Sequence, residues 1–259
     1  MDHSEPAHVV LVHGNPETPA IWRPLIASLH RRGITDVTPL SPPGFGAPLP
    51  EDFGARRLDY VDWLADEVRQ LAPIGNRQID IVGHDWGAGH VFGLAATHPG
   101  LVRSWAADCG GLLHPDYEWH DAAKTWQQPE VGEEAIAAMT AMSLAERQEM
   151  FTGLGLPDDM AAAIAPAVGA DMGRAILALY RSALEPDLRA LADRLAGVEH
   201  APCAIITATD DPYVPADFSG PVADRLGATQ IRLEGQGHWW MVSDPENAAD
   251  QLVAFWTAP

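Results

Sequence analysis

Apolar runs that alternate with helical stripes limit the fold of this chain more than any other feature of its sequence. Six runs rich in β-branched or small apolar residues predict buried strands, at 8–12, 34–40, 79–82, 102–107, 204–207 and 230–233. Between these strands the sequence predicts helices over 22–32, 58–71, 83–97 (after a turn) and 222–226, and a final helix over 246–256 follows the last strand. Strands that alternate with helices form parallel βαβ units. The sequence therefore predicts an α/β fold with a mostly parallel sheet.

The alternation is interrupted once, between residues 113 and 197. This stretch is Ala-rich and helical in period. Its breaks fall at Pro129, Gly153–Pro157, Pro166 and Pro186. A chain of 259 residues is long enough for one α/β domain and short for two. We therefore expect one core domain, residues 1–112 and 198–259, with a helical cap of residues 113–197 inserted in its second half.

The net charge and the cysteine content indicate which binding partners and which cellular compartment to expect for this protein. The formal net charge is −20, which disfavours nucleic acid and anionic membrane as partners. Cys109 and Cys203 lie in apolar runs, so we expect two buried free thiols, with a single disulfide as the alternative. The acidic start MDHSEPAH does not fit a signal peptide, and no apolar stretch reaches the length of about 18 residues that crosses a bilayer. We expect a cytoplasmic protein.

The segment from Ile79 to Gly89 places a carboxylate at a sharp turn between a strand and a helix. The turn reads Gly83-His84-Asp85-Trp86-Gly87, and a turn this tight needs small residues on both sides of its centre. It lifts the central side chain, Asp85, above the sheet at the start of the helix, where backbone N–H groups stabilise negative charge. A plain N-cap is the alternative for Asp85 taken alone. We interpret Asp85 as a nucleophile because the rest of the chain supplies its partners.

Those partners follow Asp85 in the order acid, then histidine. An acid, Asp210 or Asp211, follows the strand at 204–207, and the Asp-Pro-x-x-Pro pattern favours Asp211. His238 follows the last strand in a loop with two preceding glycines. In such a pair the acid orients the imidazole, and the imidazole takes a proton from water. We predict a catalytic triad of Asp85, Asp211 and His238, with a loop histidine of no special role as the alternative for His238.

The turn His13-Gly14-Asn15-Pro16 follows the first strand and is a candidate oxyanion hole. Backbone N–H groups of Asn15 and Trp86 would hold the negative oxygen of a tetrahedral intermediate, and one such donor is typically worth about 3 kcal/mol. A plain turn is the alternative.

Several other catalytic patterns do not occur in the sequence. No serine stands in a Gly-x-Ser-x-Gly context, no His-Glu-x-x-His or paired cysteine spacing occurs, and no Gly-x-Gly-x-x-Gly follows the first strand. These absences disfavour a serine esterase, a zinc site and a nucleotide cofactor, so we expect a cofactor-independent enzyme without a metal.

The motifs together resemble the α/β-hydrolase superfamily, and specifically its Asp-nucleophile branch of epoxide hydrolases and haloalkane dehalogenases. The segments that carry the resemblance are His13–Glu17 with Trp22-Arg23, Pro43–Gly46, Gly83–Gly87, Asp211-Pro212 and Gly237–Trp239. Members of that branch usually carry an N-terminal β-hairpin before the His-Gly segment. Only 12 residues precede His13 here. The resemblance therefore implies an α/β-hydrolase fold with a sheet of about six strands.

The two activities of that branch require different groups around the nucleophile. An epoxide oxygen leaves as an alkoxide and needs a proton donor, which the resemblance assigns to cap tyrosines, here Tyr180 together with Tyr117. A halide needs only N–H donors, which would be the side chains of Asn15 and Trp86. Leu179-Tyr180-Arg181 resembles the epoxide hydrolase cap, although packing within the cap is the alternative for Tyr180.

Other aromatic residues are candidates for the substrate pocket. We expect Trp119, Trp126 and Trp239 to line the pocket, and for Trp119 and Trp126 packing within the cap is the alternative. The favoured prediction is an epoxide hydrolase acting on a small apolar organic substrate. A haloalkane dehalogenase is the second hypothesis, and a ligand-binding protein that kept the fold and lost turnover is the third. The sequence gives no indication of oligomeric state.

Overall fold

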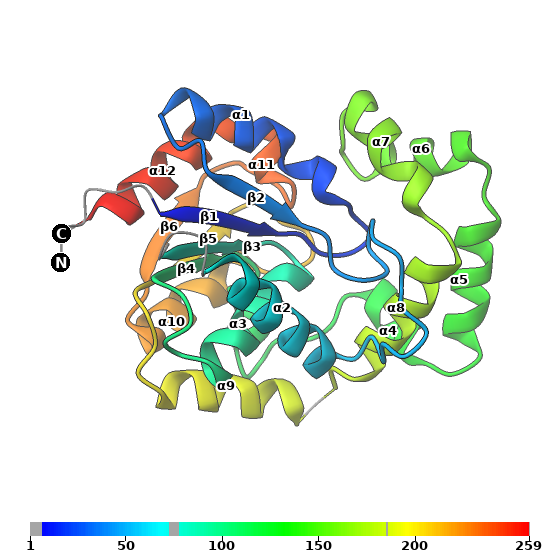
Figure 1. Cartoon of the computed structure of the whole chain (residues 1–259). Coiled ribbons are helices and arrows are strands. Elements are labelled where there is room, and N and C mark those ends of the chain that lie inside the picture. Colours follow the sequence, from blue (N-terminus) through cyan, green and yellow to red (C-terminus); the bar gives the residue numbers. More distant parts are fainter. Residues whose placement is uncertain (1–6, 73–77, 185, 259) are drawn as a thin grey trace.

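Six parallel strands form the centre of the computed structural model, which describes residues 7–72, 78–184 and 186–258 (Figure 1). The strands are β1 (His8–Val12), β2 (Val37–Leu40), β3 (Ile79–Gly83), β4 (Ser104–Ala107), β5 (Cys203–Ala208) and β6 (Thr229–Leu233). Their order in the sheet is β2-β1-β3-β4-β5-β6, and every neighbouring pair is parallel. The predicted α/β fold with about six strands is confirmed.

The order of the strands reverses direction between β1 and β3. The chain moves from β1 to β2 on one side and returns to place β3 on the other, so that Val12 pairs with both Leu40 and Gly83. At such a switch point the connections leave toward opposite faces of the sheet, which opens a crevice at the carboxyl ends of the strands. Asn15 follows β1 and Asp85 follows β3, so both lie at this crevice.

Helices cover both faces of the sheet (Figure 1). One face carries α1 (Arg23–Arg31), α11 (Trp240–Ser243) and α12 (Pro245–Thr257), and a short 3-10 helix, η1 (Pro19–Trp22), leads into α1. The other carries α2 (Arg57–Leu71), α3 (Trp86–Thr97), α9 (Asp187–Gly197) and α10 (Ala216–Leu226). Helix α10 begins six residues before the predicted 222–226, because it continues through Pro221, which sequence reasoning treats as a breaker.

The sheet is buried on both faces, and β1 demonstrates it. Val9 and Leu11 belong to one cluster of buried apolar residues, while Val10 and Val12 belong to a second on the opposite face. Side chains alternate along a strand, so a strand buried on both faces has the continuous apolar run seen here.

The prediction of free buried thiols is also confirmed, since neither cysteine is in a disulfide.

The segment between β4 and β5 is helical, with no strand among its described residues. Its elements are the 3-10 helix η2 (Gly110–Leu113), α4 (Asp121–Gln127), α5 (Val131–Ala141), α6 (Leu144–Gly153), α7 (Asp158–Ile164), the 3-10 helix η3 (Ala165–Ala167), α8 (Ala170–Arg181) and α9. Helices α4 to α8 stand together beyond one end of the sheet, whereas α9 packs against α3 (Figure 1). The division into a core and a cap of residues 113–197 remains our proposal.

Polar contacts attach these helices to the rest of the chain. The backbone N–H of Leu49 donates to Asp171 Oδ2 at 3.1 Å, and the N–H of Arg57 donates to Ser182 Oγ at 2.8 Å.

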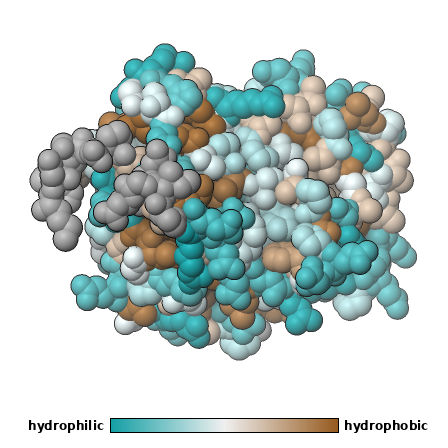
Figure 2. All heavy atoms as spheres, in the orientation of Figure 1, coloured by the Kyte–Doolittle hydropathy of each residue, from teal (hydrophilic) through white to brown (hydrophobic). Residues whose placement is uncertain are grey.

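Hydrophilic and hydrophobic residues are interspersed on the face of the molecule drawn in Figure 2. Within the described ranges, no single helix is long and apolar enough to cross a membrane, and the consecutive segments Asp158–Ala167 and Ala170–Arg181 pass such a test only together, across a bend of 87°.

Strand β3 also contains a buried carboxylate, Asp80. Its side chain accepts two hydrogen bonds from the Arg103 guanidinium, one of them at 2.8 Å, and a third from Ser104 Oγ at 2.6 Å. A buried charge is tolerated when it is paired and hydrogen-bonded in this way. This pair lies away from the crevice and ties β3 to the start of β4.

Candidate active site

Asp85 occupies a strained turn between β3 and α3. Its backbone has φ 53° and ψ −121°, a combination that costs a non-glycine residue roughly 1–3 kcal/mol. A Cβ atom at Gly87 would lie 2.0 Å from the backbone oxygen of Val12, so the turn packs directly against β1 and needs glycine there. The surrounding structure therefore fixes Asp85 at the carboxyl end of the sheet.

The carboxylate of Asp85 faces two other predicted site residues. Its Oδ1 accepts the backbone N–H of Asn15 at 2.7 Å, and its Oδ2 lies 3.9 Å from His238 Nε2. The side chain makes no capping hydrogen bond to α3, so the structure gives Asp85 no N-capping role. Burial raises the pKa of Asp85 to about 6, against the opposing effect of the nearby His238.

Gly14 brings the loop after β1 against the turn at Asp85. A Cβ atom at this position would lie 2.1 Å from Asp85 Oδ1 and 2.4 Å from the backbone nitrogen of Trp86. Only glycine lets the backbone come this close. The backbone N–H of Asn15 donates to this oxygen, and the backbone nitrogen of Trp86 lies on the same side of Gly14. An oxyanion hole formed by these two N–H groups stays a prediction.

Asp211, rather than Asp210, pairs with His238. Asp211 Oδ2 lies 2.9 Å from His238 Nδ1, and its Oδ1 accepts the backbone N–H groups of Tyr213 at 2.8 Å and Val214 at 3.3 Å. Asp210 is exposed, and its side chain accepts a hydrogen bond from the neighbouring Thr209 at 3.3 Å. Burial opposes the charge of Asp211, but the hydrogen bond and charge of His238 outweigh it and lower the pKa of Asp211.

His238 is buried and lies among groups of both signs. Burial lowers its pKa and so does the nearby His84, but the hydrogen bond and charge of Asp211 outweigh them, so the net direction is upward. The distance of 3.9 Å between its Nε2 and Asp85 Oδ2 is too long for a hydrogen bond and short enough for one bridging water molecule.

Tyr180 of α8 reaches into the same site. Asn15 Nδ2 donates to Tyr180 Oη at 3.3 Å, and the Tyr180 ring meets the Trp86 ring edge-on with centroids 5.1 Å apart. Burial and the charge of Asp85 raise the pKa of Tyr180, while hydrogen bonds from Asn15 and Trp86 act in the opposite direction. The hydroxyl is thus held by donors and keeps its own proton.

Aromatic side chains line the space above Asp85. The residues that line this cavity are Asp85, Trp86, Cys109, Leu112, Tyr117, Trp119, His120, Tyr213 and Val214. Its volume is about 10 Å³, roughly the space of one water molecule. Trp126 and Trp239 do not line it. Trp126 packs edge-on against Tyr180 at 4.8 Å between centroids, and Trp239 lines a second cavity of about 320 Å³ beside His238.

Sequence reasoning missed a buried carboxylate beside the site, Asp108. It follows β4, and its Oδ1 accepts the backbone N–H of Asp85 at 2.9 Å. Its Oδ2 accepts hydrogen bonds from His84 and from Trp240 Nε1. The available signal was its place directly after a strand, at the edge of the sheet where the other site residues lie. His120 was missed as well; its Nδ1 accepts the backbone N–H of Ala123, at the start of α4.

Two groups of side chains within the described part of the chain bring potential metal ligands within 4.8 Å of one another. They are Glu17 with His84 and His238, and Cys109 with Asp211 and His238. Glu17 and His84 are hydrogen-bonded to each other, and so are Asp211 and His238. The hydrogen bonds already account for both arrangements, and we assign no metal to them.

The fold and these residues place the chain in a known family. The chain matches the Alpha/beta hydrolase family over residues 9–251 and belongs to it. A similar solved structure is that of haloalkane dehalogenase DbeA from Bradyrhizobium elkani USDA94, with 25% identity and a TM-score of 0.73, covering 98% of this chain and 90% of that one.

Two curated proteins are similar to parts of the chain, and both are named as hydrolases. A haloalkane dehalogenase from Bradyrhizobium diazoefficiens is 31% identical over 139 residues, which is 52% of this chain and 40% of that protein. Epoxide hydrolase A from Mycobacterium tuberculosis is 34% identical over 99 residues, 38% of this chain and 30% of that protein. The chain thus spans less than half the length of either relative.

Proposed function

We propose that this chain is a cofactor-independent hydrolase in which Asp85 forms a covalent ester with a small apolar epoxide, releasing a vicinal diol. Asp85 Oδ2 attacks a ring carbon while Oδ1 stays on the N–H of Asn15. The ring oxygen takes a proton from Tyr180 as the carbon–oxygen bond breaks. The strained, buried turn at Asp85 and the similarity to an epoxide hydrolase support this step.

The position of the Tyr180 hydroxyl is the observation that carries the proposal. Its oxygen accepts a hydrogen bond from Asn15 Nδ2, and a hydrogen bond from the Trp86 side chain also lowers the pKa of Tyr180. Asn15 and Trp86 are the two donors that would otherwise hold a departing halide. With its oxygen engaged by donors, the hydroxyl has its proton left to give. An alkoxide leaving group needs such a proton and a halide does not.

The ester would be hydrolysed by water that His238 activates. Water bound between His238 Nε2 and the Asp85 carbonyl carbon gives a proton to the imidazole as its oxygen bonds to that carbon, and Asp211 stabilises the resulting charge. The tetrahedral oxygen is held by the N–H groups of Asn15 and Trp86. Collapse of this intermediate breaks the bond to the product oxygen, which takes the proton of the newly formed Asp85 acid and leaves as the diol. His238 returns its proton to the Tyr180 phenolate, so the Asp85 carboxylate, neutral His238 and neutral Tyr180 are restored.

Haloalkane dehalogenation is the second candidate function. The similarity to the dehalogenases of two Bradyrhizobium species favours it, and so do the side chains of Asn15 and Trp86, which present N–H groups near the nucleophile. In this reaction a halide would have to displace the Tyr180 hydroxyl from Asn15 Nδ2.

A comparison of two substrates tests the proposal. The purified protein is incubated with styrene oxide and, separately, with 1-bromobutane, and diol and bromide are measured. We expect diol formation to exceed bromide release. Bromide without diol would replace epoxide hydrolysis by dehalogenation. Binding of either compound without product or ester would support a ligand-binding protein.

A further inference from the structure

His84, next to the nucleophile, is buried between two carboxylates. Its Nε2 is hydrogen-bonded to Glu17 Oε1 at 3.0 Å, and its Nδ1 is hydrogen-bonded to Asp108 Oδ2. All three side chains are at least 96% buried. Ionised carboxylates are only acceptors, so both ring nitrogens of His84 carry protons. His84 is therefore a buried cation enclosed by two anions.

The two carboxylates also accept hydrogen bonds from three loops of the candidate site. Asp108 accepts the backbone N–H of Asp85 at 2.9 Å. Glu17 accepts the backbone N–H of Gly14 at 3.2 Å, directly before Asn15, and the indole N–H of Trp239, directly after His238. The two carboxylates therefore connect His84 to the loops that carry the nucleophile, the oxyanion donor and the base.

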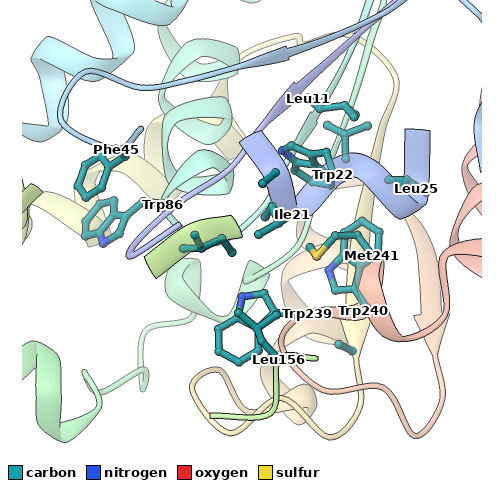
Figure 3. Close-up of a cluster of buried hydrophobic side chains, with 14 of the residues drawn as sticks. Leu11, Ile21, Trp22, Leu25, Phe45, Trp86, Leu156, Trp239, Trp240 and Met241 are labelled. Atoms are coloured by element: carbon teal, nitrogen blue, oxygen red, sulfur yellow. The ribbon is translucent and has the colours of Figure 1, made fainter. Parts of the chain in front are cut away.

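The cluster is anchored in the apolar core on one side. Trp240 Nε1 donates to Asp108 Oδ2 at 2.7 Å, and the Trp240 ring packs edge-on against Trp22 with centroids 6.0 Å apart. Figure 3 shows Trp240 and Met241 of α11 beside Trp22 and Ile21 of η1, with Leu156 close to Trp239. Close packing of this kind resists displacement of the cluster.

We propose that His84 is a positioning residue that, clamped between Glu17 and Asp108, holds the loops of Asp85, Asn15 and His238 at a fixed spacing and keeps a positive charge beside His238. The inference rests on the proposed function, since it explains how the predicted base works. The rings of His84 and His238 are 4.6 Å apart between centroids, close enough for this charge to act on the base.

The positive charge matters most once the ester exists. Asp211 and Asp85 favour the protonated form of His238, while His84 opposes it. The charges of Glu17 and His120 also interact with His238. Esterification removes the charge of Asp85, so the balance moves toward neutral His238. A neutral imidazole is the form that can take a proton from water.

Nitrogen NMR of the unmodified protein tests the charge directly and needs no substrate. We expect both ring nitrogens of His84 to stay protonated from pH 6 to pH 8, because the carboxylates raise its pKa well above the usual histidine value. A neutral His84 at pH 7 would overturn the proposal. The same spectra give the titration of His238, so the result stands even if no epoxide is hydrolysed.

A His84→Gln variant tests the positioning role. Loss of the cation is expected to raise the titration midpoint of His238 by about one pH unit, and ester hydrolysis at a given lower pH slows about tenfold. His8→Gln is the matched control, because His8 is also buried and hydrogen-bonded, to Thr38 Oγ1 at 2.7 Å, but starts β1 at the end away from the site. A uniform loss of rate with an unchanged His238 titration would show a merely structural role and reject the inference.

Discussion

The side-chain amide of Asn15 donates to the hydroxyl of Tyr180 at 3.3 Å, across 165 positions of sequence. The backbone N–H of the same asparagine donates to Asp85 Oδ1 at 2.7 Å. One residue of the loop after β1 thus fixes both the candidate nucleophile and a residue of α8. This relationship makes the chemistry of the site depend on how α8 sits over the sheet.

Replacement of Tyr180 by phenylalanine separates the two candidate reactions. We expect Tyr180→Phe to slow epoxide opening by about 100-fold or more, because the alkoxide loses its proton donor. Bromide release should stay within about threefold or rise, since Asn15 Nδ2 becomes free. Tyr60→Phe is the matched control, as Tyr60 is a buried tyrosine whose hydroxyl donates to Pro43 O at 2.7 Å. Epoxide turnover that is equal in Tyr180→Phe and wild type would remove the role of Tyr180.

Replacement of His238 by glutamine should trap the ester. Asp85 can still attack, but no base activates the water, so the protein is expected to gain the mass of the epoxide within one turnover. Mass spectrometry of the peptide containing Asp85 measures the adduct. A His238→Gln, Asp85→Asn double variant serves as the control and should gain no mass. Equal labelling of the single and double variants would place the reaction at another residue.

Ester formation should fall as the pH drops through about 6. The pKa of Asp85 is raised to about 6 by burial, so the carboxylate is charged above that pH and protonated below it. Only the charged form attacks, and the rate of the first step should decrease about tenfold per pH unit below the pKa of Asp85. Single-turnover labelling of His238→Gln between pH 4.5 and pH 8 measures this step, with circular dichroism to verify folding. Because His238 lowers the pKa of Asp85, its removal should place the midpoint in this variant above about 6. A rate that is flat across the range contradicts the assignment.

A methyl group at Gly14 should disable the site with little effect on the rest of the fold. The added Cβ would lie 2.1 Å from Asp85 Oδ1, so the carboxylate or the loop must move. A displacement of about 1 Å at the reacting atoms typically costs roughly 100-fold in rate. Gly100→Ala is the control, since no atom lies within 4 Å of its added Cβ. Full activity in Gly14→Ala would argue against the close packing of the two loops.

The pair between Asp80 and Arg103 should matter for stability and not for catalysis. Arg103→Met leaves the Asp80 carboxylate buried without its cation, and we expect a loss of about 3 kcal/mol in the free energy of unfolding. Arg225→Met removes the exposed partner of Asp193 and should cost less than about 1 kcal/mol. Urea denaturation measures both. Similar losses for the two variants would indicate that Asp80 is solvated.

The sequence predicted the sheet and most of the candidate site because both follow from local patterns. Buried parallel strands are short apolar runs, and loops at their carboxyl ends meet at one edge of the sheet. Asn15, Asp85, Asp211 and His238 each follow such a run, so their proximity could be inferred without coordinates. The choice of Asp211 over Asp210 also agreed with the observed hydrogen bond to His238.

Features that depend on packing between distant elements could not be inferred. Asp108 directly follows a strand, but its role depends on a hydrogen bond to His84, which requires that β3 and β4 be neighbours. Trp126 and Trp239 were predicted to line the pocket, and neither lines the cavity above Asp85. Trp126 packs against Tyr180, and Trp239 lines the cavity beside His238. The roles of the predicted site residues remain predictions until the variants are measured.

The cavity over Asp85 has room for about one water molecule while the segment from Leu112 to His120 stays in place. We expect this segment to move when a larger compound reaches the carboxylate. Selection by size then takes place on entry, before any bond is broken, and faster variants should be sought in this covering segment and not among Asp85, Asp211 and His238.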